Sequence, residues 1–123
     1  MATDSKLIEA GITSSRKMVG TRVENIQGEH LGKIEDVMID TGRGRVAYAV
    51  LSFGGFMGVG NKLFAFPWSA LRVHGSEKAV LLNVSKESLQ KAPGFDKENW
   101  PDMNDRIWGQ TIHSYYKVEP YWK

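Results

Sequence analysis

The sequence predicts a mainly β fold: a small antiparallel barrel or sandwich of about six short strands, followed by a helix and an aromatic extension. Between residues 18 and 84, short runs alternate apolar and polar residues, as strands of a half-buried sheet do. Glycine and polar turns separate these runs at close spacing. At Ser85 the pattern changes to a helical period. With 123 residues, the chain is long enough for one domain of ordinary size.

Residues 1–17 are expected to form a flexible leader, or a strand edge recruited on assembly. Serine, threonine and glycine are frequent there, and Leu7, Ile8 and Ile12 are too few to require burial. The segment has charged residues and lacks the apolar core of a secretory signal. No apolar run approaches the ~20 residues that span a bilayer, so a cytoplasmic location is expected.

Two central strands are expected at residues 33–41 and 45–53. In the first, uninterrupted alternation puts Val37 and Ile39 on one face and Ile34 on the other. The second is apolar on both faces, which is typical of a strand at the centre of a sheet or wrapped inside a closed one. The remaining strands are expected at residues 19–23, 63–66, 71–74 and 79–84.

Glycines mark the turns of the predicted sheet. Gly44 supplies the positive φ that a tight hairpin needs, and the Asp40 carboxylate is expected to accept hydrogen bonds from the turn amides. Residues 54–62 form a glycine-rich loop between strands, whose apolar tip, Phe56 and Met57, either contacts a partner or folds back onto the sheet. The residues assigned to structural turns are Gly28, Gly32, Asp40, Gly44, Gly54 and Gly55.

Residues 85–123 are expected to form a helix and an aromatic extension. Ser85 is a good N-cap for a short helix, and a second helix is expected over 104–116. Residues 93–123 hold seven of the thirteen aromatics. Rings of this size pack on their own sheet or against a second chain rather than remaining in water. With the loop tip, the candidate interaction residues are Phe56, Met57, Trp100, Trp108, Tyr116, Tyr121 and Trp122.

Composition and spacing leave no catalytic, cofactor or metal site to predict. Cysteine is absent, and no two histidines have the spacing of a local metal pair. The glycine loop has neither the Gly-Lys-Ser/Thr sequence of a phosphate loop nor a following helix. Asp36 and Asp40 lie roughly 13 Å apart along a strand, too far to share a proton. With a net charge of only +2, nucleic-acid binding is not favoured, although a local basic patch remains open.

Several segments of the chain together point to one protein family. They are Gly28 to Val37 (GEHLGKIEDV), Asp40, Gly44 to Val50 (GRVAYAV), Phe66 to Leu71 (FPWSAL), Ala92 to Met103 (APGFDKENWPDM), Tyr115-Tyr116 and Pro120 to Trp122. Over about residues 18–84 the chain resembles the PRC-barrel domain, which is named from the cytoplasmic part of the photosynthetic reaction centre H subunit and also forms the C-terminal half of the ribosome maturation factor RimM. The segments after residue 84 look like stand-alone bacterial PRC-barrel proteins.

The resemblance implies a small, highly bent antiparallel β-barrel that acts as a non-enzymatic module for protein contact and assembly. A homo-oligomer, most simply a dimer, is expected, with an unidentified protein partner and no cofactor. Two alternatives stay open: an RNA- or ribosome-associated maturation factor, based on Arg22, Lys33, Arg43 and Arg45, and a regulator that contacts a membrane-bound electron-transfer complex. A small ligand inside the barrel is least favoured, because side chains normally fill a barrel of this size.

Overall fold

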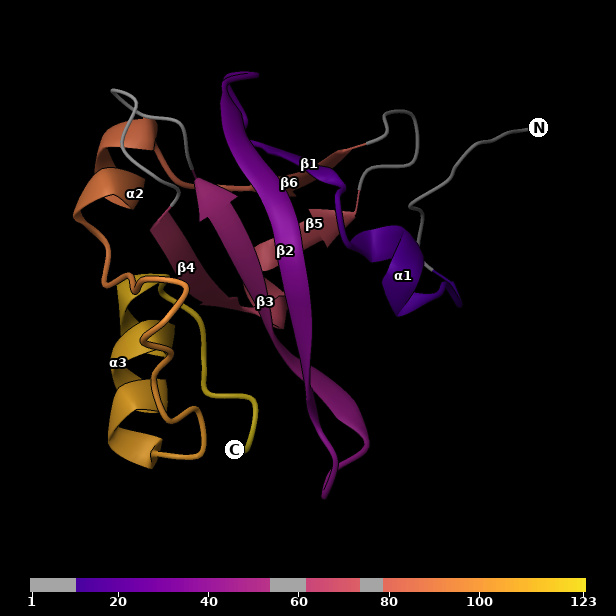
Figure 1. Ribbon diagram of the computed structural model, residues 1–123, viewed down its shortest axis with the longest axis vertical. Coiled ribbons are helices and arrows are strands. Elements are labelled where there is room, and N and C mark those ends of the chain that lie inside the picture. The colour runs from indigo at the N-terminus through magenta and orange to yellow at the C-terminus, as the bar shows by residue number, and fades with distance from the viewer. Residues whose placement is uncertain (1–10, 54–61, 74–78) are drawn as a thin grey trace.

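The computed structural model describes residues 11–53, 62–73 and 79–123 and is mainly β (Figure 1). Its six strands form one curled sheet in which β5 and β6 cross the long β2–β3 pair steeply. The strands are β1 (Arg22–Glu24), β2 (His30–Asp40), β3 (Arg45–Phe53), β4 (Lys62–Pro67), β5 (Leu71–Val73) and β6 (Ala79–Leu82). The helices are α1 (Ser15–Met18), the 3-10 helix η3 (Trp68–Ala70), α2 (Lys86–Lys91) and α3 (Arg106–Tyr115).

The strand order across the sheet is β4-β3-β2-β1-β6-β5. Four of the five pairings are antiparallel, as expected, but β1 and β6 are parallel. The β1–β6 pair is parallel because no hairpin joins these two strands. The hairpin of β6 is made with β5, and this pairing brings β6 beside β1. At the other edge of the sheet, Phe95 pairs alongside β4. It forms two backbone hydrogen bonds with Leu63, of 2.8 and 2.9 Å.

Irregularities in β2 change which of its residues face the core. The register with β3 shifts between Ile34 and Asp36 and again between Met38 and Ile39. Ile34 and Val37 consequently pack against the same core cluster, so the predicted placement of these two residues on opposite faces is wrong. A bulge inserts an extra residue into one strand, and a simple period of two cannot anticipate it.

Gly32 lies inside β2 rather than in a turn, which corrects its sequence assignment. Its φ is 150°, and a Cβ atom at this position would lie 2.2 Å from the backbone oxygen of Ser52 on β3. Gly28 and Gly44, by contrast, occupy the predicted turn segments with φ of 85° and 66°. Gly32 therefore permits the close approach of two neighbouring strands, a role that only a residue without a side chain can fill.

The α-helices that flank the sheet begin at capping residues. The Ser85 hydroxyl accepts from the Ser88 amide at 3.0 Å and starts α2, and Asp105 caps α3. In the expected leader, residues 15–17 belong to α1, because the Ser14 hydroxyl caps this turn and Met18 is buried in the core. The sheet core is therefore closed at one side by α1 and at another by α2.

Replacing Gly32 with alanine is predicted to destabilise the fold by about 2–4 kcal/mol, because the new methyl group meets backbone that cannot move aside without separating β2 from β3. Gly28→Ala is the matched control, since its φ is also positive but the space around it is open. Gly28→Ala should lower the free energy of unfolding by only about 1 kcal/mol, through backbone strain alone. Urea unfolding of both variants measures the difference, and equal costs would contradict the close-approach explanation.

Candidate functional site

The C-terminal extension packs on the sheet of its own chain, at the face of β3 that carries Tyr48. Tyr48 makes edge-on ring contacts with Trp108, His113 and Tyr121, with centroid separations of 5.1, 5.5 and 6.0 Å. Tyr48, Ala47 and Ile112 form the buried centre of this second cluster. The half-buried side chains around it are Met38, Met103, Trp108, Tyr116 and Tyr121.

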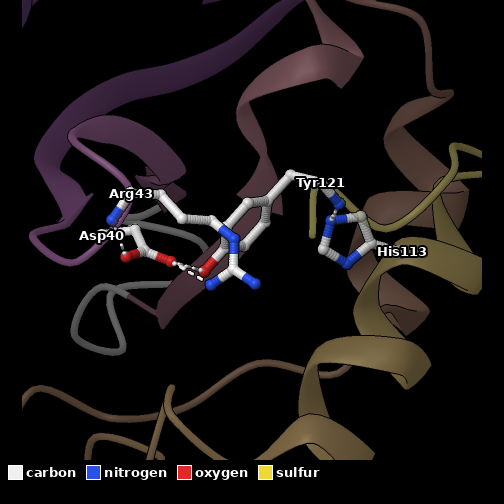
Figure 2. Close-up of polar contacts among 4 residues, drawn as sticks. All are labelled: Asp40, Arg43, His113 and Tyr121. Carbon is white, nitrogen blue, oxygen red and sulfur yellow. Dashed lines mark hydrogen bonds and ion pairs between the residues drawn. The ribbon is translucent and has the colours of Figure 1, made fainter. Parts of the chain in front are cut away.

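A hydrogen bond joins the last residues of the chain to the β2–β3 hairpin (Figure 2). The Tyr121 hydroxyl donates to Asp40 Oδ2 at 2.6 Å. Asp40 also accepts from the Arg43 amide at 2.9 Å, and the Arg43 guanidinium lies 3.4 Å from the carboxylate. The Tyr121 hydrogen bond, followed by that of the Arg43 amide, lowers the pKa of Asp40 below its ordinary value. One carboxylate thus fixes both the hairpin turn and the tail.

His113 holds the tail from the other side (Figure 2). Its side chain is fully buried; Nδ1 lies 2.7 Å from the Gly109 carbonyl oxygen, and Nε2 accepts from the Tyr121 amide at 3.3 Å. A carbonyl only accepts, so the proton sits on Nδ1 and the neutral ring satisfies both contacts. Burial lowers the pKa of His113. Protonation at Nε2 would set two donors against each other and break the contact with Tyr121.

The end of the tail fits closely against α3 at Gly109. A Cβ atom there would lie 2.8 Å from a Trp122 ring carbon and 2.9 Å from the Tyr48 hydroxyl. The Trp122 ring lies 5.1 Å from the ring of His113, edge-on. Helix, tail and β3 are therefore in direct contact, which explains a glycine in the middle of a helix despite its poor helix propensity.

Three arginines stack on the two outermost aromatic rings of the tail. Arg43 and Arg45 lie 5.9 and 5.3 Å from the centre of the Tyr121 ring, and Arg106 lies 4.5 Å from that of Trp122. Among the residues that the structure describes, Arg45 and Arg106 form no ion pair. We call these five residues, Arg43, Arg45, Arg106, Tyr121 and Trp122, the arginine–aromatic surface.

A pocket of about 360 Å³ opens beside this surface, between the β2–β3 hairpin, the start of α3 and the tail. Its walls include the side chains of Met38, Tyr48, Met103 and Arg106. The Tyr48 hydroxyl is buried and has no hydrogen-bond partner, and burial raises the pKa of this phenol. The exposed lining of the pocket is more polar than apolar, with Asp40, Arg43, Asp105 and Arg106 beside a smaller apolar part.

The structure distributes the sequence-predicted interaction residues over two locations. Trp108, Tyr116, Tyr121 and Trp122 all lie in the packed extension. Trp100 is 38% exposed and stacks on Phe95 instead. Phe56, Met57, Gly54 and Gly55 lie outside the described residues.

Sequence reasoning missed three residues of the site: Tyr48, Arg106 and His113. Tyr48 was hidden in a run of apolar strand residues, and His113 had no metal-like spacing. The one signal for His113 was its position four residues after Gly109, where a helical side chain reaches back to a carbonyl. In the part of the chain that is described, no group of three acidic or histidine residues could hold a metal ion. No described helix is long and apolar enough to cross a membrane.

The sheet and its flanking helices match a known protein family. The family model of the PRC-barrel domain matches residues 12–89. These residues run from just before α1 into α2 and so contain the whole six-stranded sheet. No curated protein matches the chain. The α3 helix and the aromatic tail lie beyond the family match.

The stability of the protein is predicted to fall as the pH decreases below about 6.5, because the folded state holds His113 neutral. The pKa of His113 is lower in the folded chain, so the unfolded chain binds more protons. The contribution of His113 to the free energy of unfolding is complete above its pKa in the unfolded chain. It is lost as the pH falls from that value toward the pKa of His113 in the folded chain. The groups facing the ring are Tyr48, Tyr121 and Trp122, with Arg106 behind Trp122.

Urea unfolding from pH 7.5 to pH 5 measures this slope, with His113→Gln as the variant that does not titrate. The variant should lose part of the slope, and NMR titration of the wild-type ring should place its pKa below 6.5. An identical pH dependence of wild type and variant, with an ordinary histidine titration, would show that burial does not hold His113 neutral.

Proposed function

The chain belongs to the PRC-barrel domain family, and from this premise we propose that it is a non-enzymatic protein-interaction module. Its contact surface is the arginine–aromatic surface formed by the hairpin and the C-terminal extension. The sheet provides a rigid base, and the extension adds aromatic rings and charged groups to one end of it. In this proposal the fold positions a surface rather than a catalytic centre.

The observation that carries the proposal is the residue composition of this surface. Arginine, tyrosine and tryptophan are the residues that most often dominate binding energy at protein interfaces. Here three arginines and two rings are already arranged before any partner binds, since Asp40 and His113 hold Tyr121 in place. A preorganised surface loses less conformational freedom on binding, which supports tight association.

An exposed apolar residue next to the arginines supports the same reading. Ile39 lines the pocket wall and is 57% exposed, although it belongs to a strand of the central sheet. An isolated exposed isoleucine needs no explanation, but one adjoining stacked aromatic rings extends the contact area. The combination of an apolar patch and unpaired guanidinium groups favours a protein partner with an acidic surface.

The basic residues do not gather in the way that favours an RNA-binding alternative. Arg22 forms an ion pair with Glu24 on β1, and Arg43 is paired with Asp40 at the hairpin. Binding along a nucleic-acid backbone requires several unpaired cations that follow the phosphates. In this protein the arginines instead stack on two neighbouring rings, those of Tyr121 and Trp122.

Site-specific cross-linking tests the proposal. A photoreactive phenylalanine analogue at Ile39, in the full chain in its native host, should give a discrete cross-linked species. Arg45→Glu reverses a charge on the surface and should reduce the yield at least tenfold. The matched control is Arg72→Glu, an exposed arginine on β5 that should leave the yield unchanged.

The mass of the cross-linked species separates a second copy of this chain from a different protein. Light scattering of the purified protein, with and without Arg45→Glu, checks the first case independently. Equal cross-link yields from wild type, Arg45→Glu and Arg72→Glu would overturn the proposal that this surface binds the partner.

A further inference from the structure

We infer that the pocket beside the arginine–aromatic surface holds a carboxylate group borne on an apolar segment of the partner protein. This inference rests on the proposed function and specifies the chemistry of its partner. The pocket lies between the hairpin that carries Arg43 and the first turn of α3, which carries Arg106. Two features of its wall lead to this ligand: the unpaired guanidinium group of Arg106 and a group of apolar side chains.

The unmatched charge on the pocket wall is positive. Four charged side chains line the pocket: Asp40, Arg43, Asp105 and Arg106. Asp40 is already paired with Arg43 and accepts from Tyr121. Asp105 caps α3 by accepting from the Ile107 amide at 2.9 Å, where the helix dipole offsets its charge. Arg106 stacks on the ring of Trp122 and forms no ion pair within the described part of the chain, so its N–H groups are available.

A guanidinium group pairs best with a carboxylate, because two parallel N–H groups match its two oxygens. Here the arginine is preorganised for this contact, since stacking on Trp122 at 4.5 Å fixes the plane of the fork. The contact remains open to a partner's side chain, because Arg106 is exposed at the start of the helix.

Part of the remaining wall is apolar and suits a hydrocarbon segment next to the carboxylate. Met38, Ala47 and Met103 line the pocket together with the Tyr121 and Trp122 side chains. A volume of about 360 Å³ accommodates one or two side chains. Methionine adapts its shape to different apolar groups, which suits the recognition of a peptide segment.

A peptide titration monitored by ¹H–¹⁵N NMR tests the inference on the full chain. The probe is acetyl-Gly-Phe-Glu-Leu-Gly-amide, and its counterpart carries glutamine in place of glutamate. The glutamate peptide should shift the amides of Arg106 and Trp108 and the Trp122 indole. It should bind at least tenfold more tightly than the glutamine peptide and weaken as salt is added. Free N-acetylglutamate at the same concentration should bind more weakly, because it lacks the apolar neighbours.

Two variants assign the contact to the pocket. Arg106→Gln should reduce the affinity for the glutamate peptide at least tenfold, whereas Arg72→Gln on β5 should not change it. Equal binding of the two peptides, no shift with either, or full affinity in Arg106→Gln would overturn the inference.

These outcomes are distinct from a failure of the proposed function. If the cross-link at Ile39 still depends on Arg45 while both peptides behave alike, the surface binds a partner without a carboxylate in the pocket. If the peptides discriminate but no cross-link depends on Arg45, the pocket binds a carboxylate but the arginine–aromatic surface does not bind the partner, and the proposed function is wrong.

Discussion

Strand β3 is buried on both of its faces, and the architecture around it follows from that constraint. Its residues from Ala47 to Leu51 are all inaccessible to solvent. The curled sheet encloses Ala49 and Leu51 in the main core, which it forms with α1 and α2. Tyr48 and Ala47 lie in a second cluster that the sheet does not close by itself. The C-terminal extension provides this cover, so the segment beyond the family match belongs to the fold as much as the strands do.

Covering β3 has a consequence for function, because the cover also creates a surface. The tail is fixed by two polar contacts, one from Tyr121 to Asp40 and one from Tyr121 to His113. With both ends of this residue held, its ring offers a fixed platform for Arg43 and Arg45. The buried half of the extension thus stabilises the domain, while its outer half carries the rings and guanidinium groups of the surface that we propose binds a partner.

The sequence predicted this fold well where local rules decide the structure. Alternation located the strands, Ser85 marked the start of α2, and the two-sided apolar run identified β3 as central. Prediction failed where contacts between distant parts of the chain determine the local structure. The bulges in β2 and the parallel pairing of β1 with β6 depend on how the sheet curls. Gly32 looked like a turn residue, because nothing local reveals the Ser52 carbonyl beside it.

The candidate site was predictable only in part for the same reason. The density of aromatic residues after residue 93 pointed to the extension, but not to the position of its partners on the sheet. Asp40 and Tyr121 are 81 residues apart, and no pattern links them. His113 joins the candidate site through its burial against Tyr121, and Arg106 joins it through its contact with Trp122.

The most direct measurement of the central claim is the pKa of Asp40, followed by carboxyl ¹³C NMR in the wild type and in Tyr121→Phe. If the tail docks on its own sheet, the wild-type pKa lies below the ordinary value of 3.8 and rises in the variant. The difference should not depend on protein concentration. An Asp40 pKa that is the same in both proteins, or that differs only at high concentration, would contradict docking within one chain.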